Sequence, residues 1–353
     1  MPLSLPIDRK FRSEDLAACR ALLRGGSRSF HAASLLLPAR VRDPASALYA
    51  FCRVADDAID REGGAKAALA TLHMRLDGIY RGMPADHPAD RAFAAVVERH
   101  LIPRALPDAL LDGFAWDLEA RRYETIEDLH GYAARVAGCV GVMMTLVMGR
   151  REPAVLARAC DLGMAMQLTN IARDVGEDAR DGRLYLPQQW LREAGVDPEA
   201  FLAGPRFSEN LGGVVQRLLD HADDLYARAT HAISALPADC RPAIHAARVL
   251  YAEIGRELER NGLDSVSMRA VVPASRKLAV LLRTCTDSLA RPQLATMPVS
   301  APAAFLIEAV SSVPHAIPER IRPMPWHRVR DRAIWVIDLF ERLERRAQME
   351  RAG

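Results

Sequence analysis

Apolar residues recur at steps of three and four along most of the chain. This spacing places them on one face of an α-helix, which completes a turn in about 3.6 residues. The pattern is clearest in residues 68–82, 91–101, 127–149, 214–236 and 249–260. Few segments alternate with a period of two, and none of these is flanked by a hairpin signal such as Asn-Gly. The pattern therefore predicts an all-α protein with roughly ten or more helices.

Proline interrupts this pattern near the C-terminus. Seven prolines lie between residues 292 and 325, a density that breaks regular structure. We therefore expect one domain at 1–290, followed by a Pro-rich linker and a C-terminal amphipathic helix within 291–353. That helix is expected at about 326–346, with an apolar stripe and an Arg-rich opposite face. It could dock on the core, pair with another subunit or lie on an anionic membrane surface.

Composition argues against several classes of protein. A net charge of +2 over 353 residues provides no global field that would attract nucleic acid. The six cysteines are scattered, without the spacing of a zinc site. The usual signatures of nicotinamide-binding, P-loop, zinc-protease and α/β-hydrolase folds are absent. The N-terminus has no apolar signal core, and no apolar run approaches the roughly 20 residues that span a bilayer. We therefore expect a cytoplasmic protein.

The stretch NIARDVGEDARDGRLYLP, residues 170–187, gathers acidic residues tightly. In a helix, Gln167, Asn170, Asp174 and Asp178 would fall within about 80° of one another. Two carboxylates four residues apart repel each other on a bare helix. A divalent cation such as Mg²⁺ would compensate, since it binds one or two carboxylates together with waters and substrate phosphates.

A second stripe lies upstream in LYAFCRVADDAID. Here Tyr49, Arg53, Asp56 and Asp60 would fall within about 60° of one another. If the two helices face each other, four carboxylates line one cavity and could hold a cluster of ions that binds a diphosphate. The alternative is that each stripe is a solvated face. The apolar flanks of both motifs and their duplication favour the metal interpretation.

Two further segments fit such a cavity. In GGSRSFHAASLLLP, the residues Ser27, Ser29 and Phe30 precede an apolar run, where hydroxyls and backbone N–H groups suit phosphate oxygens or form an ordinary helix cap. Tyr132 opens a helix rich in Ala and Gly. Those small residues could leave room for a long apolar ligand or permit close helix packing.

Together these segments resemble the squalene/phytoene synthase family of head-to-head prenyl synthases. The resemblance extends in the family's order over residues 15–285, and the second acidic motif with its RLYLP ending is the most specific part. It rests on SRSFHAASLLLP, LYAFCRVADDAID, GFAWDLEARRYETIEDLHGYAARVAGCVGVMM, LGMAMQLTNIARDVGEDARDGRLYLP and YAEIGRELERNGLD with Arg269. Within the family, the chain looks most like the bacterial phytoene synthases.

The resemblance implies an isoprenoid-synthase helical fold with a central cavity. It assigns metal binding to four carboxylates, Asp56, Asp60, Asp174 and Asp178. It assigns catalytic roles to Arg53, Tyr132, Arg173 and Tyr185. It assigns substrate binding to Ser27, Ser29, Phe30, Tyr49, Gln167, Asn170, Tyr251 and Arg269.

The implied reaction joins two geranylgeranyl diphosphates through a cyclopropylcarbinyl (prephytoene) diphosphate to phytoene, the first committed step of carotenoid biosynthesis. It would use Mg²⁺ or Mn²⁺ and no NADPH. A head-to-head synthase acting on C15 donors, giving dehydrosqualene, squalene or hydroxysqualene, remains the alternative, followed by a non-catalytic scaffold of the same fold. Expected partners are the prenyl diphosphate, a downstream carotenoid desaturase and, through peripheral contact, the cytoplasmic face of the inner membrane.

Overall fold

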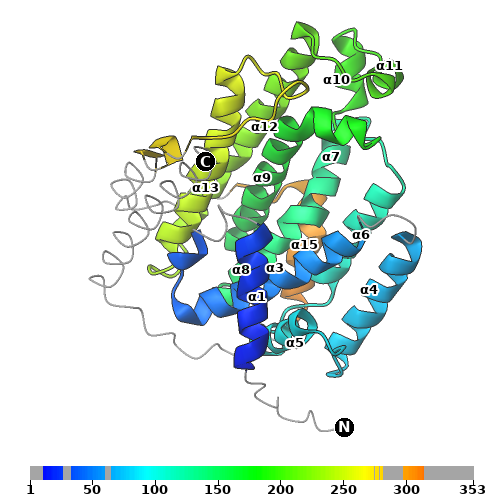
Figure 1. Ribbon diagram of the computed structural model, residues 1–353. Helices are drawn as coiled ribbons and strands as arrows, with labels where there is room; N and C mark the ends of the chain where they lie inside the picture. Colours follow the sequence, from blue (N-terminus) through cyan, green and yellow to red (C-terminus); the bar gives the residue numbers. More distant parts are fainter. Residues whose placement is uncertain are drawn as a thin grey trace, which may run out of the picture.

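The computed structural model describes residues 11–26, 33–59, 65–273, 275–277, 279–280 and 297–313. These residues form helices joined by short loops, with no β-strand among them, so the predicted all-α fold is confirmed (Figure 1). No helix in this part of the chain is both long and apolar enough to cross a membrane. The predicted helix at 326–346 and the predicted boundary near residue 290 lie outside the described residues.

The first half of the chain supplies one side of the bundle. It comprises α1 (Ser13–Gly26), α3 (Ala39–Ile59), α4 (Ala65–Tyr80), α5 (Pro88–His100), α6 (Ala105–Leu118), α7 (Ile126–Ala133), the π-helical turn η1 (Ala134–Gly138) and α8 (Cys139–Val147). The second half comprises α9 (Pro153–Arg180), α10 (Gln188–Glu193), α11 (Pro198–Ala203), α12 (Glu209–Ile233), α13 (Arg241–Arg260), the 3₁₀ turn η2 (Ala301–Ala303) and α15 (Ala304–Ser311).

Local sequence explains where several helices begin. Thr125 forms a capping box with Asp128 at the start of α7, because each accepts a hydrogen bond from the other's backbone N–H. Ser208 caps α12 by accepting from the Leu211 N–H. Proline occupies the first turn of α5, α9, α11 and α13, where its missing N–H has no helical partner to lose.

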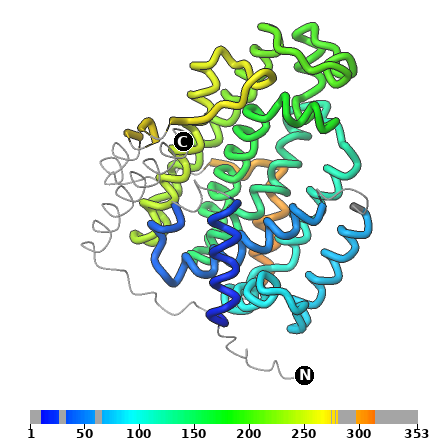
Figure 2. The backbone as a smooth tube through the Cα atoms, viewed as in Figure 1, coloured from blue at the N-terminus to red at the C-terminus, as the bar shows by residue number. Residues whose placement is uncertain are grey.

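The long helix α9 forms the axis of the molecule. It contacts α12 most extensively and also packs against α8, η1 and α13. Figures 1 and 2 show α9 through the middle, with α10 and α11 toward one end and α5 toward the other. On the N-terminal side, α3 packs against α1 and α5, where Phe51 stacks on Phe93 with ring centroids 4.3 Å apart.

Glycines let the segment from α7 to α8 approach α9 closely. A Cβ atom on Gly163 would lie 2.4 Å from the Ala137 carbonyl oxygen, and one on Gly141 would lie 2.3 Å from that of Ala159. Both distances are shorter than any real Cβ contact. Close helix packing is therefore one reason for the small residues after Tyr132. Ala137, Gly141 and Gly163 also line a cavity, so the second predicted reason holds for these positions too.

Candidate active site

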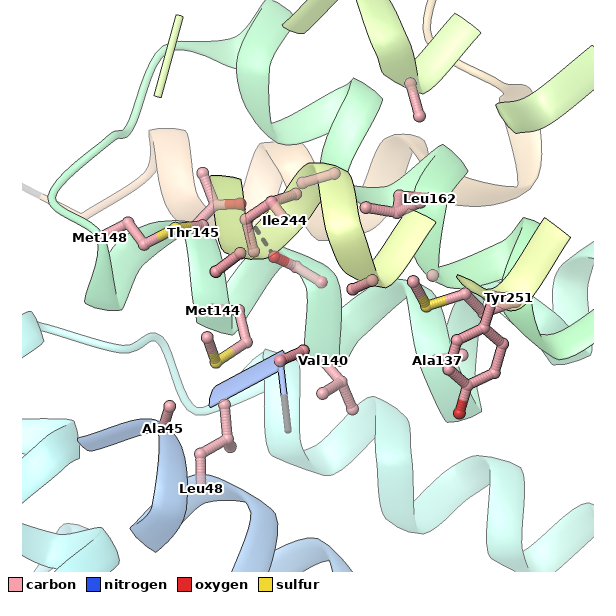
Figure 3. Close-up of a pocket in the computed structure, with 18 of the residues that line it drawn as sticks. Ala45, Leu48, Ala137, Val140, Met144, Thr145, Met148, Leu162, Ile244 and Tyr251 are labelled. Atoms are coloured by element: carbon pink, nitrogen blue, oxygen red, sulfur yellow. Dashed lines mark hydrogen bonds between the residues drawn. The ribbon is translucent and has the colours of Figure 1, made fainter. Parts of the chain in front are cut away.

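A cavity of about 350 Å³ lies between α3, η1, α8, α9 and α13. Its volume falls within the range of about 300–1,000 Å³ that is common for ligand sites. The wall is predominantly apolar. It includes Leu48, Val140, Met144, Leu162 and Ile244, which are labelled among the lining side chains in Figure 3. Such a wall suits a long hydrocarbon chain and excludes water.

The cavity has a polar end, which holds predicted substrate-binding residues, and a mostly apolar far end, which also includes Arg158. Along α9 its lining runs from Val155 to Asn170, a rise of about 22 Å at 1.5 Å per residue. Figure 3 places Tyr251 at one end and Met148 at the other. Four of the predicted substrate-binding residues, Tyr49, Gln167, Asn170 and Tyr251, line this cavity.

The first acidic motif lies on α3, just beyond Tyr49. Arg53 pairs with Asp56 at 3.4 Å and with Asp57 at 2.6 Å, and all three side chains are about 40% exposed. The carboxylates of this motif are therefore less buried than its apolar flanks suggest. Burial raises the pKa of the Tyr49 hydroxyl; the charge of Arg53 opposes that shift, and those of Asp56 and Asp57 add to it.

The second motif lies on the C-terminal part of α9. Arg173 donates two hydrogen bonds to Asp174, at 2.7 and 2.5 Å. Arg269, far along the chain, donates a hydrogen bond to the same carboxylate at 3.2 Å and forms an ion pair with it at 2.9 Å. It also pairs with Glu177. Asp174 is thus held by two arginines at once.

Arg269 belongs to a loop that α9 holds in place. Gly176 N–H donates to the Ser265 carbonyl oxygen at 3.0 Å, and Arg180 donates to that of Val266 at 2.6 Å. A Cβ on Gly176 would lie 2.5 Å from the Val266 carbonyl oxygen. Glycine inside the second acidic motif therefore permits the loop to rest on the helix, which brings Arg269 to Asp174.

The two motifs share electrostatic surroundings at the polar end. The pKa of Tyr251 is raised to about 12, chiefly by burial; Arg173 opposes the shift, and Tyr49 and Asp174 add to it. Groups on both α3 and α9 therefore shift the pKa of Tyr251. Tyr49 of the first stripe and Asp174 of the second therefore both lie near Tyr251, whereas the convergence of the carboxylates on one metal site stays a prediction.

Asp178 lies within electrostatic range of several other carboxylates. Its pKa is raised to about 7, chiefly by burial and then by the charges of Asp174, Glu177 and Asp117, while Arg183 opposes the shift. A group of oxygen ligands that repel one another suits a hard divalent cation. Among the described residues, no three acidic, histidine or cysteine side chains come close enough to form a metal site. Asp60, the fourth predicted ligand, lies outside the described residues.

Two predicted catalytic tyrosines meet at a residue that sequence reasoning missed. Tyr185 donates to one oxygen of Asp117 at 2.7 Å, and Tyr132 donates to the other at 3.0 Å. Their rings stack with centroids 5.1 Å apart, and neither residue is among those that line the 350 Å³ cavity. Burial raises the pKa of both phenols, and the Asp117 charge raises it further, so both stay protonated. The available signal was an aspartate near the end of an apolar helical run, GFAWDL.

Three predicted substrate-binding residues cannot be placed. Ser27, Ser29 and Phe30 lie outside the described residues. The remaining predicted site residues lie on α3, α7, α9 and α13 and on the two loops that follow α9 and α13.

Comparison with known proteins identifies the family. The family model described as squalene/phytoene synthase matches residues 23–277. A phytoene synthase of Rhodobacter capsulatus is 53% identical over 287 residues, which cover 80% of this chain and 85% of the relative. A phytoene synthase of Cereibacter sphaeroides is 54% identical over 290 residues, covering 79% and 82%.

A solved structure has the same architecture. The crystal structure of a dehydrosqualene synthase in complex with ligand superposes with a TM-score of 0.71 at 31% sequence identity, covering 78% of this chain and 96% of that one. The family match spans more than two thirds of the chain and contains every predicted site residue. The chain belongs to the squalene/phytoene synthase family.

Proposed function

We propose that this chain is a phytoene synthase, a prenyltransferase that joins two geranylgeranyl diphosphates head to head. The observation that supports the proposal most is the apolar cavity, whose polar end is flanked by carboxylate and arginine stripes on α3 and α9. The identity of more than half of the aligned residues to bacterial phytoene synthases favours the C20 donor over the C15 donor.

The proposed metal ligands are Asp56, Asp60, Asp174 and Asp178, with Mg²⁺ or Mn²⁺ as the ion. The fit rests on the chemistry of the donors, which are hard carboxylate oxygens, and on the raised pKa of Asp178 among its acidic neighbours. A bound ion would supply positive charge where diphosphate departs.

The arginines would bind and orient the diphosphates. Arg53, Arg173 and Arg269 each already contact a carboxylate of the two motifs, so their guanidinium groups lie beside the place where phosphate oxygens would sit. Planar guanidinium groups match phosphate geometry with paired N–H donors. Gln167, Asn170 and Tyr251 would position the first carbons of the prenyl chain at the polar end of the cavity.

The tyrosine pair would present two fixed phenol oxygens, since both O–H groups are donated to Asp117. Because Tyr132 and Tyr185 share the Asp117 carboxylate, both phenols are held in one orientation. In the proposed reaction the allylic bond to diphosphate breaks, the double bond of the second substrate attacks carbon 1, and a proton leaves to close the cyclopropane. A second ionisation, rearrangement and proton loss give phytoene. The apolar wall keeps water from the cationic intermediates.

A product assay tests this proposal. The purified full-length protein is incubated with geranylgeranyl diphosphate and Mg²⁺, without NADPH, and the lipid extract is identified by mass. We expect a C40 hydrocarbon that disappears in Asp56→Asn and Asp174→Asn. Asp86→Asn is the matched control, because Asp86 is fully exposed and pairs with Arg91 outside the motifs.

The alternative products separate the rival functions. A C30 hydrocarbon made from farnesyl diphosphate, with no C40 product, would assign the chain to the C15 branch of the same family. No product from either donor in a folded protein would favour the scaffold. In both cases the phytoene synthase proposal fails.

We also propose peripheral membrane contact. Phytoene has no polar group, so it must leave the cavity for a lipid phase or a partner enzyme such as a desaturase. Met268 and Val271 are exposed beside Arg269, near the second motif. Co-flotation of the full chain with anionic liposomes but not with neutral ones is the expected result, and absence of flotation with either would contradict the proposal.

A further inference from the structure

Residues beyond the family match fold back onto the bundle. The match ends at residue 277, yet η2 packs against α7 and η1, and α15 packs against α9, α6 and α8. The packing face of η2 and α15 is a buried apolar stripe formed by Ala303 of η2 and by Leu306, Ile307 and Val310 of α15. This segment therefore supports η1, α8 and α9, which also line the cavity.

Two arginines attach the start of this segment to the bundle. Arg158 on α9 donates to the carbonyl oxygens of Met297 at 3.4 Å and Pro298 at 3.0 Å. Arg228 on α12 donates to the Pro298 carbonyl oxygen at 3.0 Å. Both arginines also pair with Asp161, at 2.8 and 3.0 Å, and Asp161 is fully buried. We call Arg158, Asp161 and Arg228 the arginine clamp.

Arg158 is a charged residue in the wall of an apolar cavity. Its side chain is only 3% exposed, and it lines the cavity at the N-terminal end of the α9 stripe. Burial lowers the pKa of Arg158 and raises that of Asp161, while their mutual attraction opposes both shifts. A buried charge needs both an opposite charge and hydrogen-bond partners. Asp161 supplies the first, and the carbonyls of Met297 and Pro298 add to the second.

The position of Arg158 matches the length of one prenyl donor. Arg158 precedes Asn170 by twelve residues of α9, a rise of about 18 Å. An extended polypeptide rises about 3.5 Å for every three backbone bonds, and an extended prenyl chain has similar bond lengths. The sixteen main-chain bonds of a C20 donor then span about 19 Å, and the twelve of a C15 donor span about 14 Å. With its diphosphate at the Asn170 end, a C20 chain reaches Arg158, whereas a C15 chain ends about one helical turn short of it.

We propose that Arg158, fixed by the backbone of Met297 and Pro298, forms the end wall that matches this cavity to a C20 chain, together with Val155 one turn further along α9. Residues 297–313 are then part of the substrate site, although they lie outside the family match. The proposal rests on the orientation of the substrate in the proposed function. Arg158 is a specificity-determining residue in this assignment, because it meets the far end of the chain rather than the reacting carbons.

Binding of unreactive substrate analogues tests the end wall apart from catalysis. Geranylgeranyl and farnesyl thiolodiphosphate are titrated into the full-length protein with Mg²⁺, and their dissociation constants are measured by calorimetry. In Arg158→Leu we expect the C20 analogue to bind at least tenfold more weakly and the C15 analogue to change less than twofold. Equal weakening of both analogues, or no change in either, would overturn the proposal.

The matched control is Arg75→Leu. Arg75 donates two hydrogen bonds to Asp90, at 2.8 and 2.6 Å, and Asp90 is fully buried. This pair resembles Arg158 with Asp161 but does not line the cavity. We therefore expect a comparable loss of stability without any change in the ratio of the two dissociation constants. A changed ratio in the control would show that destabilisation alone explains the effect, which also overturns the proposal.

Arg228→Gln provides a second, milder variant. It removes one attachment of the segment and keeps Arg158 in the cavity wall. We expect faster amide hydrogen exchange in residues 304–312 and about a threefold fall in C20 preference. Faster exchange with unchanged preference would exclude the segment from the substrate site. Phytoene production by the wild-type protein is measured separately, so a failed end wall is distinguishable from a failed proposed function.

Discussion

Tyr185 donates its hydroxyl proton to Asp117 at 2.7 Å, across 68 positions of the chain. Tyr132 occupies the other oxygen of the same carboxylate. One aspartate thus fixes two phenols that no local sequence pattern connects, and it lies within electrostatic range of the proposed metal ligand Asp178.

Removing this shared acceptor should slow turnover. In Asp117→Asn we expect kcat to fall by about 10- to 100-fold with little change in KM, since a hydrogen bond to a charged group contributes about 1.5–3 kcal/mol. Tyr185→Phe should show a smaller fall. Steady-state kinetics with geranylgeranyl diphosphate measure both. Tyr80→Phe is the control, because it removes a partly buried hydroxyl that donates to the Ile102 carbonyl oxygen outside the proposed site, and it should leave kcat unchanged. Wild-type kcat in Asp117→Asn would refute a positioning role.

Arg269 should contribute to diphosphate binding. In Arg269→Gln we expect KM for geranylgeranyl diphosphate to rise about tenfold, because a charge-assisted hydrogen bond is lost. Arg256→Gln is the matched control, since Arg256 also bridges two carboxylates, Asp223 and Glu259, and lies outside the proposed site. If both variants keep the wild-type KM, Arg269 only neutralises Asp174.

Gly176 should tolerate no side chain. A Cβ there would lie 2.5 Å from the carbonyl oxygen and 2.6 Å from the Cα of Val266, so the loop must move and Arg269 with it. We expect Gly176→Ala to reduce the free energy of unfolding by about 1–3 kcal/mol and to lower kcat/KM. Urea denaturation and kinetics give the two readouts.

Gly213→Ala is the control for that substitution. Gly213 also lies within a helix, α12, but is exposed, with open space where a Cβ would stand. Alanine there should be neutral or stabilise the protein by up to about 1 kcal/mol. Gly176→Ala with wild-type stability and kinetics would mean that the loop adjusts freely.

Stability should fall as the solution is acidified. Burial, followed by the charge of His221, lowers the pKa of His130 from 6.5 to about 4. Between about pH 6.5 and pH 4, His130 therefore binds a proton in the unfolded chain but stays neutral in the folded chain. The free energy of unfolding declines across that window by at most about 1.4 kcal/mol per pH unit for this group.

Urea denaturation between pH 7 and pH 4.5 measures this slope. His130→Gln should reduce it, leaving the part that comes from His100, whose pKa burial also lowers to about 4. An identical slope in His130→Gln would show that other groups control the acid sensitivity.

The sequence by itself determined the helices and the two acidic stripes. A period of 3.6 residues is a local property, so α4, α5, α12 and α13 could be predicted from their apolar positions alone. The same periodicity assigned Gln167 and Asn170 to one face of α9, and both line the cavity. The resemblance of ordered motifs then indicated the family, which the family match over residues 23–277 confirms.

Only the tertiary structure decided which distant residues meet. Asp117 accepts hydrogen bonds from Tyr132 and Tyr185, which lie on other elements. Arg158 donates to backbone carbonyls that lie 139 and 140 positions further along the chain. Periodicity reports which face of a helix is apolar, but it does not report what packs there. Backbone carbonyls such as those of Met297 and Pro298 are the same in every residue, so no sequence pattern marks them as partners. Folding alone places them against a buried guanidinium, because a charge removed from water must find its hydrogen bonds within the protein.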